Sequence, residues 1–178
     1  MNRALCIALA MFASTVLAQD KPASSESDKS TESLKLPTYY QGEQGGLPKR
    51  GFRILGKAED YESFKKLMKS KGKGDELPES KEIDFSKQRV LVADYGTAES
   101  CKGIFPIALF RTKDEKVHVR YDFSSFQVRS TGEIAPPTYH SWSVMVVPLN
   151  EKGYVIETDH QRIKGEPEKW AADAELKP

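Results

Sequence analysis

The hydrophobic positions of this chain form short runs separated by polar turns, and these runs predict one helix and several strands. Apolar residues recur at helical spacing over residues 59–70, which predicts an amphipathic helix. The segments 90–93 and 144–147 are apolar without interruption, as is typical of strands covered on both faces. Residues 117–123 alternate between apolar and polar, which predicts a strand with one buried face. Further strand positions are expected at 52–55, 103–110, 142–149 and 155–158.

Turn residues predict how these strands end and connect. Gly96 is expected to end the strand that contains residues 90–93, and Pro106 is expected to create an edge or a bulge within its own strand. Asn150 to Gly153 form a turn sequence, so the strands on either side of it are predicted to pair as a hairpin.

The helix is predicted to run from about Glu59 to Ser70, with Asp60 as a cap and Lys65 on its solvent face. A second, short helix or an irregular tail is expected over residues 163–178. Together these elements predict an α+β fold, a mostly antiparallel β-sheet of five to seven strands packed with one main α-helix and preceded by a disordered N-terminal tether.

The N-terminus predicts export. Arg3 precedes an apolar run that ends in small residues at Ala18, the pattern of a cleaved secretory signal over residues 1–18. We therefore expect export through the Sec pathway to the periplasm or the medium, with no stable membrane insertion after cleavage. Residues 19–48 are polar and serine-rich and are interpreted as a disordered linker. The folded domain is expected over residues 49–162.

Charge and cysteine content narrow the classes of partner. Once Arg3 is removed with the signal, basic and acidic residues balance at 26 each, which disfavours a nucleic-acid partner. Of the two cysteines, Cys6 lies in the signal, so the mature chain keeps only Cys101 and cannot form an internal disulfide. Cys101 is therefore a small buried residue, a bridge to a partner, or a reactive thiol.

Core-strand motifs in this chain resemble the C-terminal domain of the PrcB family. They are the helix segment DYESFKKLMK (60–69), IDFSKQRVLVADYGTAES (83–100), VHVRY (117–121) and YHSWSVMVVPL (139–149). The resemblance covers about residues 50–160, but the family's Thr-Gly-Gly-Tyr turn is replaced by residues 100–103. It implies an accessory role, in which an exported domain stabilises a protease complex through protein contacts. It implies no catalytic residue.

A search for catalytic and metal-binding patterns gives weak candidates. Cys101 could act as a nucleophile with His118 or His140, or as a copper or zinc ligand with two of His118, His140 and His160, but none of these lies at the close spacing of a ligand pair. The glycine-rich run 42–46 lies in the predicted linker, outside the strand–loop–helix context of a phosphate-binding loop. Asp94 is interpreted as the point where its strand leaves the core. We predict no catalytic residue, no metal and no cofactor.

The strongest candidate for a binding surface precedes the strand at 142–149. Pro137, Tyr139, His140 and Trp142 combine a stiff backbone with large aromatic groups, as in an interface hot spot. The alternative is that Tyr139 and Trp142 cap the core. The favoured hypothesis is an exported, non-enzymatic interaction domain with a protein partner in the cell envelope. The sequence does not determine its oligomeric state.

Two other hypotheses stay open from the sequence. One is an exported thiol or metal-binding protein centred on Cys101. The other is a small-ligand binder with a pocket lined by Tyr121, Phe123, Phe126 and Trp142.

Overall fold

A computed structural model describes residues 31–47, 49–99, 101–125, 137–161 and 165–178. These residues contain nine strands, one α-helix and one short 3-10 helix. In chain order they are β1 (Glu32–Leu34), β2 (Tyr39–Gly42), β3 (Gly51–Leu55), α1 (Ala58–Ser70), η2 (Ser80–Glu82), β4 (Gln88–Ala98), β5 (Cys101–Arg111), β6 (Val117–Ser125), β7 (Tyr139–Pro148), β8 (Tyr154–Asp159) and β9 (Trp170–Leu176).

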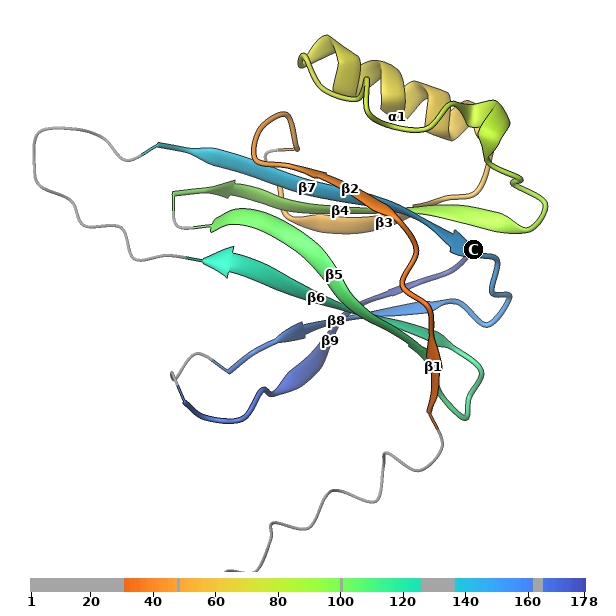
Figure 1. The fold of residues 1–178 in the computed structure, drawn as a ribbon, viewed down its shortest axis with the longest axis vertical. Coiled ribbons are helices and arrows are strands. Elements are labelled where there is room, and N and C mark those ends of the chain that lie inside the picture. Colours follow the sequence, from red (N-terminus) through yellow and green to blue (C-terminus); the bar gives the residue numbers. More distant parts are fainter. Residues whose placement is uncertain (1–30, 48, 100, 126–136, 162–164) are drawn as a thin grey trace, which may run out of the picture.

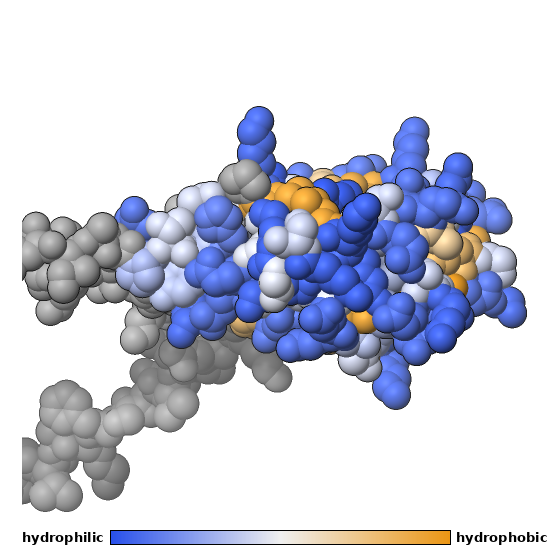
Figure 2. Space-filling view, turned by 90° about the horizontal axis from the view of Figure 1, so that it is seen from above, coloured by the Kyte–Doolittle hydropathy of each residue, from blue (hydrophilic) through white to orange (hydrophobic). Residues whose placement is uncertain are grey.

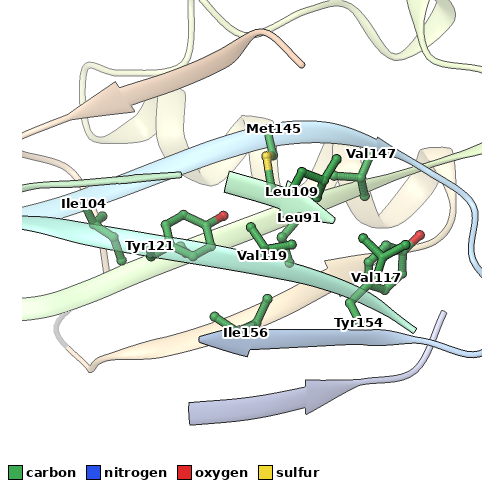
Figure 3. Close-up of a cluster of buried hydrophobic side chains, with 11 residues drawn as sticks. Leu91, Ile104, Leu109, Val117, Val119, Tyr121, Met145, Val147, Tyr154 and Ile156 are labelled. Carbon is green, nitrogen blue, oxygen red and sulfur yellow. The ribbon is translucent and has the colours of Figure 1, made fainter. Parts of the chain in front are cut away.

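The strands form two stacked sheets, and α1 covers the outer face of one of them (Figure 1). The four-stranded sheet has the order β2-β7-β4-β3, and the five-stranded sheet has the order β1-β5-β6-β8-β9. One hydrophobic cluster fills the space between the sheets, where Figure 3 shows its large side chains. A second cluster lies between α1 and the four-stranded sheet. The predicted α+β class is thus confirmed in its coarse form, but the strands exceed the expected five to seven.

The two uninterrupted apolar segments lie in the two central strands of the four-stranded sheet, as predicted. In β4, Val90 and Val92 point toward α1, whereas Leu91 and Ala93 point between the sheets, and all four are fully buried. β7 is buried in the same way and pairs with β4 along its whole length. An amphipathic strand could not occupy this middle layer, because both of its faces lie against apolar neighbours.

The predicted hairpin between β7 and β8 is wrong, because the chain crosses from one sheet to the other at this turn. β8 pairs in parallel with β6 and antiparallel with β9. Asn150 Nδ2 donates to the carbonyl of Glu115 at 2.8 Å, and Val117 N–H donates to Gly153 O at 3.1 Å. These bonds attach the turn to the β5–β6 connection, so β8 continues in the five-stranded sheet.

Both ends of the chain contain strands that the composition did not reveal. The expected linker over 19–48 includes β1, which pairs with β5, and β2, which pairs with β7. The expected tail or short helix over 163–178 is strand β9, whose Ala174 and Leu176 pack on the cluster between the sheets. β1 and β2 obtain their backbone hydrogen bonds from partners distant in sequence, and β9 from the preceding strand β8; local composition does not reveal these partners.

Details of two elements also differ from the sequence prediction. Helix α1 begins after Lys57, which makes no side-chain cap bond, so the predicted cap by Asp60 is wrong. Gly96 does not end β4 but occupies a β-bulge with a φ of 86°, and the strand continues to Ala98. The predicted irregularity at Pro106 is confirmed as a register shift in β5. Among the described residues, no helix is long and apolar enough to span a bilayer.

The surface above α1 is mostly hydrophilic, with small separate hydrophobic areas (Figure 2).

Lys65, predicted to face solvent, is instead buried. Its Nζ donates to the carbonyl of Pro78 at 3.1 Å and to Glu79 Oε1 at 2.6 Å. The segment after α1 folds back over the helix and covers this lysine, which the helical periodicity alone could not show.

Candidate functional site

Three connections of the sandwich meet at one end, which we call the loop end. It comprises residues 42–47 at and after the end of β2, residues 97–99 and 101–103 where β4 ends and β5 begins, and residues 137–140 at the start of β7. Antiparallel pairing brings them together, because Ala98 pairs with Tyr139 and Gly42 pairs with Trp142. In Figure 1 this is the end at which β4 stops and β7 begins. Most of the sequence-predicted surface residues fall here.

Trp142 anchors the loop end from inside the molecule. Its side chain is only 3% exposed and packs in the cluster beneath α1, so it caps the core and is not a surface contact. Its Nε1–H donates to the carbonyl of Gln44 at 2.8 Å. A Cβ at Gly42 would lie 2.7 Å from the same Nε1, so only glycine allows this close approach. The indole thus fixes the backbone of residues 42–44.

Asp94 provides the second anchor. Its side chain is 2% exposed, so the strand does not leave the core at this residue, contrary to the sequence interpretation. Oδ1 accepts a hydrogen bond from the N–H of Leu47 at 3.0 Å, while Oδ2 forms an ion pair with Arg53 Nη2. A buried carboxylate is stable only when it is paired and hydrogen-bonded in this way. It therefore holds the far end of the loop against β3.

Backbone contacts complete the attachment of the glycine-rich run 42–46. The N–H of His140 donates to Glu43 O, and the N–H of Gly46 donates to His140 O, both at 3.0 Å. Lys71 Nζ donates to the carbonyl of Gly46 at 3.2 Å. A Cβ at Gly46 would lie 2.5 Å from the His140 carbonyl. The run is therefore an ordered loop that extends the β2–β7 pairing, and its glycines were the one signal the sequence offered.

The exposed side of the loop end carries mixed polar and aromatic groups. Pro137 is exposed, whereas Tyr139 and His140 are half-buried. Gln44 Nε2 donates to the carbonyl of Thr138 at 3.0 Å, which joins the loop to the start of β7. Beside it lies a depression of about 320 Å³ between β2 and β5. It is lined by Gln41, Gly42, Glu43, Lys102, Gly103 and Phe105, with an ion pair from Lys102 to Glu43 at 3.7 Å.

Of the histidines in the thiol and metal hypothesis, His140 lies at the loop end with Cys101, whereas His118 lies far from it. Cys101 begins β5 at the loop end, but its side chain lies outside the described part of the structure. His118 pairs with Glu157 at 2.7 Å near the opposite end of β6. Ser125, the partner of Cys101, follows His118 by seven positions, which span about 23 Å at 3.3 Å per residue. Among the described residues, no three metal-ligating side chains come together.

The residues of the small-ligand hypothesis do not line one pocket. Tyr121 points between the sheets, where burial raises the pKa of its hydroxyl, whereas Trp142 points toward α1. Phe123 packs edge-on against Tyr95 at a centroid distance of 4.9 Å. Phe126 lies outside the described residues. Among the three described lining residues, Trp142 thus lies in a different layer of the fold from Tyr121 and Phe123.

The resemblance to the PrcB family rests on the motifs quoted above, which lie in α1, β4, β6 and β7. No family model, no curated protein and no solved structure matches this chain.

Proposed function

We propose that this chain is an exported, non-enzymatic interaction domain that acts as an accessory or stabilising subunit of a protease complex in the cell envelope or the medium. The observation that carries the proposal is the anchored loop at residues 42–47. Two buried side chains, Trp142 and Asp94, use their polar atoms to hold the backbone of an exposed loop. A surface that is ordered before binding loses less entropy on association.

The composition of the exposed surface supports the same role. Tyr139 and His140 lie half-buried beside the exposed Pro137, Glu43 and Gln44, so aromatic area is bordered by polar groups. Protein interfaces combine aromatic anchors with a polar rim in this way. The resemblance to the PrcB family supplies the expected class of partner, because it implies contacts with a protease complex.

Capture of the partner from a native envelope fraction tests the proposal. The mature chain is cross-linked in that fraction and compared with a Glu43→Lys, Gln44→Ala double variant. A matched control carries Lys81→Ala, an exposed residue of η2. We expect wild type and control to recover the same protease-containing complex and the double variant to lose it. Failure to recover any partner, while a known exported complex is captured in parallel, refutes the proposal.

A further inference from the structure

The free edge of β3 is the least protected strand edge in the described part of the chain. β3 is the last strand of the four-stranded sheet and pairs only with β4 (Figure 1). Its five residues follow β4 in continuous register, from Gly51 opposite Asp94 to Leu55 opposite Val90. It contains neither a proline nor a bulge. Such an edge presents a regular row of backbone donors and acceptors.

The other described edges are shorter or irregular. β1 and β2 have only three and four residues. β5, beyond the part that β1 covers, contains Pro106 and two register shifts. β9 is interrupted by a register shift at its pairing with Ile156 and Glu157. Irregularities of this kind protect sheet edges from pairing with other chains. β3 lacks them, so any selectivity at its edge must come from its side chains.

Cationic side chains surround β3. Lys49, Arg50, Arg53 and Lys57 fall within nine residues, and the first acidic residue after them is Glu59. Arg50 pairs with Asp173 of β9, and Arg53 pairs with Asp94. Lys49 and Lys57 are exposed, and within the described ranges no carboxylate is found at ion-pair distance from either. This local positive charge contrasts with the balanced charge of the chain as a whole.

Arg53 retains hydrogen-bonding capacity at the centre of the edge. Its side chain is 36% exposed, and its guanidinium lies 5.5 Å from the centre of the Phe64 ring. Its Nε is buried beyond the reach of a partner, so only the exposed part of the guanidinium is available for a new contact. Phe52 and Ile54 on the same strand pack on the cluster between the sheets, so β3 itself is held rigidly. A partner therefore meets a fixed backbone edge whose midpoint carries the partly exposed guanidinium of Arg53.

We propose that this edge binds an extended acidic segment of a partner protein, which adds to the four-stranded sheet as an antiparallel strand. The inference rests on the proposed interaction function and specifies the chemistry of the partner. Backbone pairing supplies affinity, and carboxylates opposite Arg53, Lys49 and Lys57 supply selectivity. A second copy of this chain is disfavoured, because the two-fold antiparallel register that pairs all five residues of β3 would place Arg53 opposite Arg53.

Peptide binding to the mature protein tests the inference. The probe is a short peptide in which glutamate and valine alternate. One control peptide has lysine in place of glutamate, and another is the glutamate peptide N-methylated on alternate residues. We expect the glutamate peptide to bind, to weaken with added salt, and to protect backbone amides of β3 from hydrogen exchange. The lysine peptide and the N-methylated peptide should not bind.

A protein variant separates charge from backbone pairing. Lys49→Glu with Lys57→Glu should weaken the glutamate peptide by about fivefold or more. The matched control, Lys66→Glu with Lys81→Glu, changes the same charge at exposed positions on α1 and η2 and should leave affinity unchanged. The inference is overturned if the N-methylated peptide binds as tightly as the unmodified glutamate peptide. It is also overturned if the control variant loses as much affinity as Lys49→Glu with Lys57→Glu, or if the peptide protects amides outside β3 from exchange. If the peptide fails to bind while the envelope partner is still captured, only this inference falls.

Discussion

Replacing Asp94 with alanine tests whether a buried carboxylate holds the loop end in place. The substitution removes the acceptor of the Leu47 N–H and the partner of Arg53. A hydrogen bond to a charged group contributes about 1.5–3 kcal/mol to stability. Breaking a fully buried ion pair costs about 3–5 kcal/mol, but Arg53 is 36% exposed and can regain water, so we take the lower end of that range. We expect a net loss of about 3 kcal/mol.

Asp94→Asn provides a graded comparison. Its side-chain oxygen can still accept from Leu47, but its NH2 group cannot accept from Arg53, so both the charge and the acceptor opposite Arg53 are lost; we expect a loss of about 1–2 kcal/mol. Asp75→Ala is the matched surface control, because Asp75 is 89% exposed and lies 3.6 Å from Lys69. It should change stability by less than about 0.5 kcal/mol.

Urea unfolding followed by tryptophan fluorescence measures all three variants. Trp142 lies next to the loop that Asp94 holds, so its emission reports both local and global loss of structure. The slope of free energy against urea should stay constant if the native state stays compact. If Asp94→Ala is as stable as Asp75→Ala, the proposed anchoring role of Asp94 is refuted.

Three further substitutions probe other parts of the fold. The hydrogen bond from Lys65 lowers the pKa of Glu79, so the pair stabilises the protein at neutral pH, and this stabilisation is lost as the pH falls through the lowered pKa. When the unfolding midpoint is measured against pH, Lys65→Met should show a weaker dependence on pH below about 5 than the wild type. Gly153 has a φ of +94°, and a Cβ there would lie 2.7 Å from Leu176 O, so Gly153→Ala should lower the free energy of unfolding by about 1–3 kcal/mol. Trp142→Phe should lower the free energy of unfolding by about 1 kcal/mol, because the hydrogen bond to Gln44 O is lost, and should remove the emission of the buried tryptophan. An unchanged unfolding midpoint would contradict the anchoring role of Trp142.

Local patterns were sufficient wherever burial follows from a strand's own sequence. The apolar segments of β4 and β7 predicted their central positions, because only a strand covered on both faces needs such a sequence. The alternation in β6 predicted its buried Val117, Val119 and Tyr121. Helix α1 was likewise predicted within one residue of its start.

Non-local contacts decided the features that the sequence did not reveal. β1 and β2 are too short for a local signal and form because β5 and β7 supply their hydrogen bonds. Lys65 is buried because a later segment folds over it. The positions of the candidate site residues were predicted only in part. Tyr139 and His140 lie half-buried at the loop end, but Trp142 is buried beneath it and holds the loop by a hydrogen bond. The glycines of 42–46 were visible, yet their close approach to Trp142 and His140 requires the fold.

Asp94 connects the two proposed binding surfaces, because one of its carboxylate oxygens contacts the loop end and the other contacts the edge of β3. Oδ1 holds the loop through Leu47, and Oδ2 engages Arg53 at the midpoint of the β3 edge. Asp94→Asn keeps an acceptor for the loop but withdraws the charge that competes for the guanidinium. The acidic peptide should therefore bind this variant more tightly than wild type, whereas Asp94→Ala should also weaken capture at the loop end. Equal peptide affinity for wild type and Asp94→Asn would show that Arg53 does not contact the added strand.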